Sequence, residues 1–411
     1  MNKANRPDHY RDLPIGRRIA QLRVRRGMNQ QVFADRIGKS KSWVDKVERG
    51  VRRLDRLPTI DTVAAALGVS PTVLLGRDTR HPPATSGTTA SALERVREAL
   101  ASYGPPTGRD WPPSTAELHR QVTYALTAYR HAHHHHVLRI LPGLITAARH
   151  ASRPEATAAA ARPAGDLLVQ VYRLTAHTLV KLGDPRTAWL AADRAHTVAA
   201  GDPCLTAHAA IALAQALRAL NRAHLALSAA TAAVHPIDPT PHRPSPPDQL
   251  ALAGILLTEA AIAAATHDPD TAHDLLHRAG QLAARWTAGH RPDDQGFGPV
   301  TVTLARALVA AHLGDHHTAL THHHQASRDP GWQRLPAEHR AAHLIDITRA
   351  HLDVGDHHTA GRTIVTADQT APHEVRLRPV TRTLLAVILR AGPTPADVTR
   401  LANTVGLTRN A

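Results

Sequence analysis

Three lysines lie close together near the N-terminus of this 411-residue chain. Lys39, Lys41 and Lys46 are three of only five lysines, whereas the arginines number 44. An ammonium group donates hydrogen bonds to guanine O6 and N7, and the hydroxyl of Ser42 can bond to either base of a pair. A helix that exposes Lys41, Ser42 and Lys46 on one face would therefore be able to read base edges in the major groove.

Positive charge continues just beyond these residues, at Arg52, Arg53 and Arg56. The first 80 residues hold 18 Lys and Arg against 8 Asp and Glu, so about ten of the net +15 charges lie in the first fifth of the chain. Guanidinium groups beside a duplex supply affinity that depends on salt and not on base sequence. The asymmetry predicts a compact basic module that binds nucleic acid, on a weakly charged body.

The helices that position these side chains can be predicted from the spacing of apolar residues and from the capping and turn residues between them. We expect a first helix over Ile15–Arg26, a second after the cap Asn29, a third after the cap Ser40, and two short helices near Thr59–Leu67 and Ser70–Leu75. Gly38 makes the turn before the third helix. The first helix should turn Ile19 and Leu22 inward and Arg17, Arg18, Arg25 and Arg26 outward; the next two should bury Val32, Phe33, Ala34, Ile37, Val44 and Val47.

Residues at fixed places in this segment match a known pattern. They are Arg23, Gln30, Phe33, Ala34, Gly38, Ser40, Val44, Val47, Glu48-Arg49-Gly50, and the closing Leu67-Gly68-Val69-Ser70 with Leu74-Leu75. The pattern resembles the Xre family, the Cro/C1-type helix-turn-helix regulators. The resemblance implies a five-helix DNA-binding domain over residues 10–78, with the N-terminal side of the third helix facing the bases.

The resemblance also implies roles for single residues. Lys41, Ser42 and Lys46 would read bases, whereas Gln30 would contact a phosphate and brace a residue of the third helix. Trp43 would contact a sugar or a thymine methyl, and Asp45 would orient Lys41 or Lys46. The complete expected DNA-binding set is Gln30, Ser40, Lys41, Ser42, Trp43, Lys46, Arg52, Arg53 and Arg56.

A joint rich in helix breakers follows over residues 79–115. Thr79–Ser91 and Gly104–Ser114 are dense in Pro, Gly, Ser and Thr, which is typical of linkers. A short amphipathic helix is expected between them, over Ser91–Tyr103. This organisation predicts a basic domain that can reorient relative to its body.

The body, residues 116–411, contains an internal repeat. Five turns, which begin at Gly183, Asn221, His267, Gly314 and Gly355, are each followed by an alanine and by a second alanine seven residues later. A small residue also precedes each turn by seven positions. The three positions of the five repeats are Ala176, Ala188 and Ala195; Ala214, Ala226 and Ala233; Ala260, Ala272 and Ala279; Ala307, Ala319 and Ala326; and Thr348, Ala360 and Ala367.

Small residues at these positions let two antiparallel helices cross closely. The pattern resembles the tetratricopeptide repeat, in which a helix A, a turn and a helix B stack into a superhelix. Together with the alanine-rich composition and only 3% aromatic residues, it predicts an all-α chain, a helix-turn-helix domain followed by a tetratricopeptide-like α-solenoid.

Helix A of each repeat would line the concave face of such a solenoid. The expected face is polar at one end and apolar in the middle, where Gly254, Leu257 and Ala261 also project onto it. This suits a short peptide or a small amphipathic molecule. The candidate ligand-binding residues are Gln170, Arg173, His177, His208, Gln215, Arg218, Leu304, Leu308 and Arg349.

The combination of both parts resembles quorum-sensing regulators that bind short secreted peptides. It implies a homodimeric, signal-responsive regulator of transcription that binds a double-stranded DNA operator. An adaptor whose repeats bind a partner protein is the alternative, and an enzyme with a cryptic hydrolytic site is the third class. Only Asn221 among six asparagines lies in the repeats, so Arg, Gln and His would have to hold a peptide backbone.

Other classes of function find little support in the sequence. One cysteine, Cys204, allows no intrachain disulfide and no cysteine zinc site. The N-terminus lacks a secretory apolar segment, and the longest apolar run, Leu250 to Ala265, is too short to span a membrane. The 31 histidines include the clusters His131–His136 and His322–His324 and the i,i+4 pair His312 and His316, but no set of ligands typical of a metal site. We expect a cytoplasmic, nucleoid-associated protein with no catalytic residues, metal or cofactor.

Overall fold

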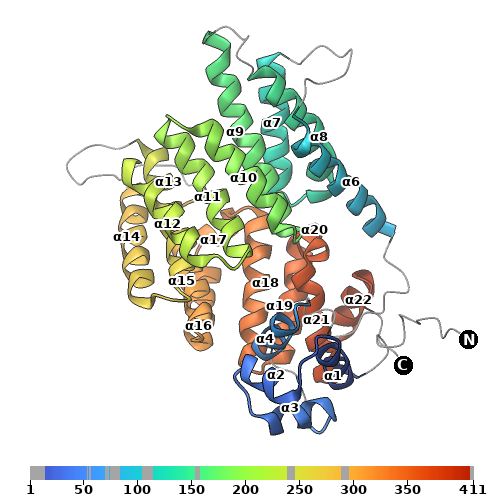
Figure 1. Cartoon of the computed structure of the whole chain (residues 1–411). Coiled ribbons are helices and arrows are strands. Elements are labelled where there is room, and N and C mark those ends of the chain that lie inside the picture. The colour runs from blue at the N-terminus through green and yellow to red at the C-terminus, as the bar shows by residue number, and fades with distance from the viewer. Residues whose placement is uncertain are drawn as a thin grey trace, which may run out of the picture. The chain divides into compact units, whose positions relative to one another are not determined.

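The computed structural model describes residues 14–52, 54, 57–69, 74, 84–103, 114–152, 158–237, 246–287 and 296–407. All of the regular elements within these ranges are helices, so the predicted all-α fold is confirmed (Figure 1). None of the described helices is both long enough and apolar enough to cross a membrane.

The N-terminal segment forms four described helices. They are α1 (Ile15–Arg25), α2 (Gln30–Arg36), α3 (Lys41–Glu48) and α4 (Leu57–Leu67). The predicted caps are confirmed: Asn29 Oδ1 accepts from the Val32 amide at 2.8 Å, and Ser40 Oγ accepts from the Trp43 amide at 3.1 Å. Most of the expected fifth helix, Ser70–Leu75, lies outside the described residues.

Two orientations in this segment differ from the prediction. Arg18 is only 7% exposed, because it lies on the same helical face as Ile15, Ile19 and Leu22, the side of α1 that packs inward. Val32 is 49% exposed, because Phe33, Ala34 and Ile37 already form the buried stripe of α2 and its C-terminal end. Both errors come from assigning a face by residue type and not by helical angle.

The predicted joint is also different. Helix α6 runs over Ala84–Ala101 and so begins seven residues before the expected start at Ser91. Its buried residues Ala92, Val96 and Leu100 belong to one hydrophobic core with α7 (Thr115–Arg130) and α8 (His134–Ala151). The amphipathic helix therefore packs in the body and is not an isolated helix between two linkers.

Five helix pairs follow α8, one for each predicted repeat. They are α9 (Ala158–Lys181) with α10 (Pro185–Ala199), α11 (Pro203–Ala219) with α12 (Ala223–Val234), α13 (Pro247–Ala264) with α14 (Pro269–Thr287), α15 (Pro299–His312) with α16 (His316–Arg328), and α18 (Ala337–Asp353) with α19 (His357–Thr370). In four of them an Asp caps the second helix by accepting from the amide three residues later: Asp184, Asp268, Asp315 and Asp356. The remaining short elements are η1 (His235–Ile237), α17 (Gly331–Arg334), α20 (Pro372–Leu377), α21 (Pro379–Ala391) and α22 (Ala396–Thr404).

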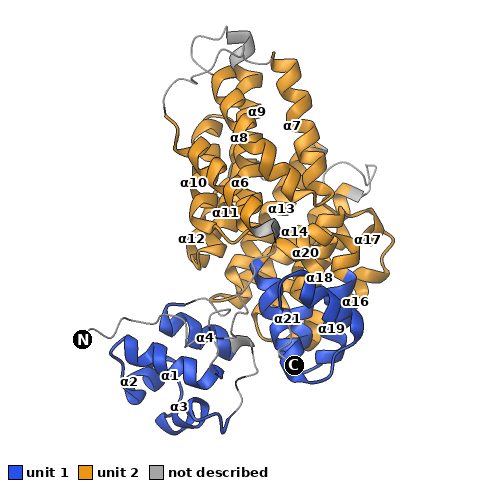
Figure 2. Cartoon of the chain, turned by 90° about the vertical axis from the view of Figure 1, so that its right-hand side faces the viewer, with its two compact units in different colours: residues 1–84, 348–366, 379–411 blue, residues 85–347, 367–378 orange. Residues whose placement is uncertain are grey.

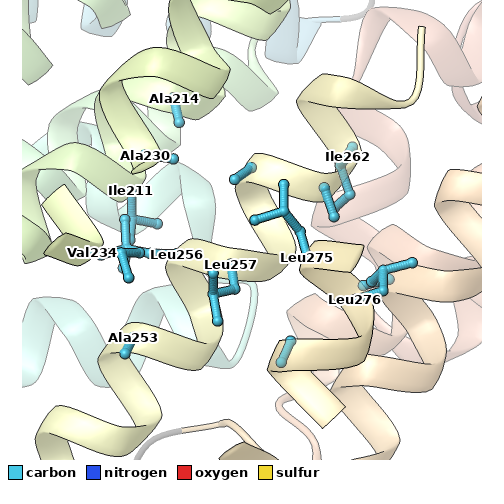
Figure 3. Close-up of a cluster of buried hydrophobic side chains, with 14 of the residues drawn as sticks. Ile211, Ala214, Ala230, Val234, Ala253, Leu256, Leu257, Ile262, Leu275 and Leu276 are labelled. Atoms are coloured by element: carbon cyan, nitrogen blue, oxygen red, sulfur yellow. The ribbon is translucent and has the colours of Figure 1, made fainter. Parts of the chain in front are cut away.

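The small residues of the repeat lie where the helices of each pair cross. All fifteen positions are buried, and the most exposed of them, Ala233, retains 6% of its surface. The core between α11, α12, α13 and α14 adds branched side chains such as Ile211, Leu256 and Leu275 around these alanines (Figure 3). The first helices of successive pairs also pack side by side, α9 on α11, α11 on α13 and α13 on α15, so their remaining faces form one continuous surface.

The chain forms two compact units, which Figure 2 shows in different colours. Unit 1 holds residues 1–84, 348–366 and 379–411, and unit 2 holds residues 85–347 and 367–378. The N-terminal helices thus group with the C-terminal helices and not with the repeats that follow them along the chain. The predicted domain boundaries at residues 78 and 115 separate the N-terminal helices from all later helices, so they do not predict that the N-terminal and C-terminal helices form one unit.

The crossing of the helix pairs can be tested with a leucine. Ala226 is fully buried between α11 and α12, so Ala226→Leu would insert three carbon atoms into a packed crossing and lower the free energy of unfolding by about 1–3 kcal/mol. Ala219→Leu, at an exposed position of α11, is the matched control and should change it by less than about 0.5 kcal/mol. Urea denaturation of both variants measures the difference, and equal stabilities would contradict the close crossing.

Candidate functional site

Helix α3 is held so that one of its faces remains free. Val44 and Val47 are buried beneath it, and Gly38, with φ of +63°, allows the tight turn that precedes its cap. Gly16 of α1 lies so close that a Cβ there would be 2.0 Å from the Val47 carbonyl oxygen. The two helices therefore cross at backbone contact, which fixes the direction in which α3 points.

A buried polar network at the C-terminal end of α3 adds to this contact. Glu48 is 6% exposed and accepts two hydrogen bonds from Arg23 of α1, at 2.6 and 3.0 Å. Gln30 of α2 donates to the same carboxylate at 2.9 Å. Bidentate arginine-carboxylate pairs impose both distance and plane, so one carboxylate joins all three helices.

The expected bracing role of Gln30 is confirmed by this bond to Glu48, at the C-terminal end of α3. Its contact with a phosphate stays a prediction. The expected role of Asp45 is wrong, because its carboxylate forms an ion pair with Arg49 one turn later and not with a lysine. Sequence reasoning included Arg23 and Glu48 in the family pattern without recognising that they pair.

The predicted base-reading residues share one exposed face. Lys41, Ser42 and Lys46 are exposed, as is Arg52 beyond the helix, whereas Trp43 is half-buried. The hydroxyl of Ser40 is used as the helix cap. Arg53 and Arg56 lie outside the described residues. The described part of the set thus presents two ammonium groups and a hydroxyl from less than two turns of a fixed helix.

A second group of polar residues lies on the first helices of the repeats. We call Arg173, His177, His208, Gln215, Arg218 and Glu259 the polar row; they come from α9, α11 and α13. His177 Nδ1 donates to Gln215 Oε1 at 2.8 Å, and Gln215 Nε2 donates to Glu259 Oε1 at 2.6 Å. Arg218 binds the other oxygen of Glu259 at 2.6 Å. Five of the six are predicted ligand-binding residues, and Glu259 is the one that sequence reasoning missed.

The histidines of the polar row are neutral at pH 7. Burial lowers the pKa of His177 to about 4, and the charge of Arg173 adds to this effect. Burial also lowers the pKa of His208 to about 3, again with a contribution from Arg173. Burial lowers the pKa of Arg173 itself to about 10, so its guanidinium keeps its charge at neutral pH.

A buried charge cluster lies beside the polar row in unit 2. Its members are His134, Lys181, Glu338, Glu374 and Arg378, and its centre is the fully buried carboxylate of Glu374. Lys181 donates to Glu374 at 2.6 Å, and Lys181 also pairs with Glu338. His134 and Arg378 complete the contacts of Glu374. Burial alone would raise the pKa of Glu374, but Lys181, Arg378 and His134 together hold it well below its ordinary value.

The charge cluster joins residues that are far apart in the sequence. His134 and Glu374 are separated by 240 positions, and Lys181 and Glu338 by 157. The helices at the start of unit 2 therefore contact those at its end. Because no local pattern links such positions, the sequence carried no signal for this contact.

The remaining predicted ligand-binding residues lie elsewhere. Gln170 is half-buried on α9, one turn before Arg173. Leu304 is buried, and Leu308 packs against the core that contains Leu257 and Ala261. A Cβ at Gly254 would clash with the ring of Phe297. Arg349 forms an ion pair with Asp61 of α4, within unit 1.

The histidine clusters do not assemble metal ligands. Within the described residues, no group of three or more His, Cys, Asp or Glu side chains is arranged to hold a metal ion. His323 and His343 instead bond to each other at 3.1 Å and pack on Trp332.

Comparison with known proteins identifies the N-terminal part. A family model described as a helix-turn-helix domain matches residues 14–75. The HTH-type transcriptional regulator SinR of Bacillus subtilis (strain 168) is 33% identical over 89 residues, which are 21% of this chain and 78% of SinR. The chain belongs to the helix-turn-helix transcriptional regulators. Its other four fifths lie outside the aligned segment.

One solved structure is similar over a longer stretch. It is the crystal structure of Bacillus thuringiensis PlcR in complex with the peptide PapR7 and DNA, which is 14% identical, covers 67% of this chain and 96% of its own, and aligns with a TM-score of 0.31. A TM-score this low leaves the arrangement of the repeats to be judged from this chain alone.

The low histidine pKa values predict a loss of stability in acid. In the unfolded chain the two histidines have the ordinary pKa of 6.5, whereas in the folded chain the pKa of His177 is about 4 and that of His208 about 3. The unfolded chain therefore binds more protons as the pH falls, and acidification favours unfolding. Each should lower the free energy of unfolding by about 2 kcal/mol between pH 7 and pH 5. Urea denaturation across this range measures the slope.

A double variant separates these histidines from the others. His177→Gln with His208→Gln should flatten the slope, whereas His196→Gln, at an exposed position of α10, should leave it unchanged. The same slope in the double variant would show that the two imidazoles already bind protons in the folded chain.

Proposed function

We propose that this regulator reads a specific operator through the exposed face of α3. Support comes from Lys41, Ser42 and Lys46, which share that face while Val44, Val47 and Glu48 fix the helix from beneath. A helix that is already fixed needs no further ordering of its backbone when it binds, so its side chains reach the bases from defined positions. This arrangement is the observation that carries the proposal.

The other residues of the DNA-binding set would set affinity and register. Arg52 is exposed just beyond α3, and Arg53 and Arg56 follow it in the sequence. Their charges would bind phosphates without regard to sequence. Gln30 and Trp43 flank the exposed face and would contact the phosphate and sugar.

A dimer would place two such helices on one operator. Helix-turn-helix dimers bind half-sites about one helical turn apart, which makes the operator palindromic. We assign dimerisation to the body, which contains residues 116–411 of the chain. The regulator would act in the cytoplasm, at the nucleoid.

The repeats would hold a signal, which is a short peptide or a small amphipathic molecule. Five consecutive helix pairs with small residues at each crossing support a tetratricopeptide-like solenoid. The polar row on α9, α11 and α13 offers hydrogen-bonding groups on the side that such solenoids use for binding. Of the apolar candidates, Leu308 remains half-buried and Leu304 is part of the packed interior.

The signal would alter DNA binding through unit 1. That unit contains the DNA-binding helices together with residues 348–366 and 379–411. Within it, Arg349 of α18 forms an ion pair with Asp61 of α4. Because α18 continues from unit 2 into unit 1, a ligand that prefers one position of α18 would bias the N-terminal helices as well.

Substitution of the lysines tests the reading face. Lys41→Ala and Lys46→Ala should each cost about 1–3 kcal/mol of operator binding and relax the preference at one base pair. Selection of bound sequences from a random DNA pool, followed by fluorescence anisotropy on the selected site, measures both effects.

Two matched variants separate reading from charge. Lys39→Ala removes the same charge from the turn before α3 and should leave the sequence preference intact. Arg52→Ala should weaken all sequences equally and reduce the slope of log affinity against log salt by about 1. Unchanged preference after substitution of both Lys41 and Lys46 would refute the assignment of α3.

Native mass spectrometry tests whether the body dimerises and holds a signal. The purified chain should appear as a dimer that retains a small mass, and removal of that mass should change operator affinity. A retained protein in place of a small molecule, with unchanged operator affinity, would favour the adaptor function instead.

A further inference from the structure

The half-buried cations of the polar row and of the charge cluster differ in one respect. Lys181 binds two carboxylates, Arg378 binds Glu374, and Arg218 binds Glu259. Arg173 forms no hydrogen bond or ion pair with any residue that the structure describes, and its Nε is buried without a partner. The polar row therefore contains one guanidinium whose charge is not balanced by a described carboxylate.

An unpaired guanidinium with a buried Nε carries an energetic cost. Removing a charge from water costs several kcal/mol unless a counter-charge and hydrogen bonds replace the solvent. Burial lowers the pKa of Arg173 only to about 10, so the group cannot escape the cost by losing its proton at pH 7. A bound anion would supply the missing counter-charge and hydrogen bonds.

The carboxylates at the start of α11 and in the polar row have other partners. Glu259 is bound on both oxygens by Gln215 and Arg218. Asp202 caps α11 by accepting from the amides of Cys204 and Leu205. Neither forms an ion pair with Arg173.

A second unpartnered group lies beside the guanidinium. His208 Nδ1 on α11 is buried and has no hydrogen-bond partner, and the charge of Arg173 on α9 contributes to the lowered pKa of His208. Because the imidazole of His208 is neutral at pH 7, it can donate one hydrogen bond without adding a second positive charge beside Arg173. The preceding helix turn places half-buried Gln170 on the same face as Arg173.

We propose that Arg173, with His208 beside it, binds an anionic oxygen group of the signal, a carboxylate or a phosphate. The planar fork of a guanidinium matches two oxygens of either group. This assignment rests on the proposed function, in which the repeats hold the signal, and it adds the chemical class. A neutral or cationic molecule would leave the charge of Arg173 unbalanced.

The test compares two arginines of the same row, in the full-length chain at pH 7 and constant ionic strength. In sodium chloride, Arg173→Met should raise the thermal midpoint because it removes an unbalanced charge. Arg218→Met should lower it, because that change leaves Glu259 without its guanidinium. A lowered midpoint for Arg173→Met as well would show that Arg173 already has an internal partner and would overturn the proposal.

Replacing chloride by phosphate or by acetate distinguishes the two anions. The anion that resembles the signal should raise the midpoint of the wild type by a saturable amount and should not do so in Arg173→Met. Phosphate stabilises many proteins by exclusion from their surfaces, so the difference between the two chains is the result that counts. Equal shifts in both chains for both anions would also overturn the proposal.

Native mass spectrometry separates this inference from the proposed function. If the wild type retains a small molecule and Arg173→Met retains equally much, the anion site is wrong although the repeats bind a signal. If neither chain retains one but phosphate or acetate stabilises only the wild type, the anion site stands and the proposed signal binding lacks support.

Discussion

The close crossing of paired helices is the constraint on which the body depends. Each of the five crossings uses three small residues, and all fifteen are buried. A larger side chain at such a position would force the axes apart, so the alanines set the distance between the two helices of every pair. The first helices of successive pairs also pack on one another, α9 on α11 and α11 on α13. The polar row lies on these same helices and joins them through the hydrogen bonds of Gln215.

Charges in the interior serve a different purpose from the alanines. The cluster around Glu374 joins α8 and α9 to α18 and α20 within unit 2. Burying five ionisable groups gains little stability over apolar packing, because their loss of hydration offsets most of the attraction. What the cluster supplies is a fixed geometry: a carboxylate bound from three sides admits few alternatives. Arg173, a short distance along the same helix as Lys181, lacks this balance, and the contrast is the basis for assigning it to a ligand.

The DNA-binding part applies the same principle on a smaller scale. Glu48 is bound by Arg23 and Gln30, so three helices meet at one carboxylate. The contact of Gly16 with the Val47 carbonyl holds α1 and α3 together at the same end of α3. The side chains of Lys41 and Lys46 are exposed and form no hydrogen bond or ion pair with any residue that the structure describes. The internal polar groups of this domain therefore orient its helices. Its exposed lysines remain available for the DNA-binding role that we propose.

Local patterns in the sequence were enough to predict the helices, the caps and the repeat. Asn29, Ser40 and Gly38 act on neighbouring residues, and the alanines recur at fixed intervals, so local chemistry was enough to predict them. It also identified most of the polar row, because residues one turn apart share a helical face. Two features depend on the tertiary structure alone: the cluster around Glu374 and the pairing of Arg349 with Asp61. Each depends on which distant helix lies opposite, and a linear pattern contains no information about residues hundreds of positions away. For the same reason, the sequence marked Arg173 as a candidate but could not show that it lacks a counter-charge.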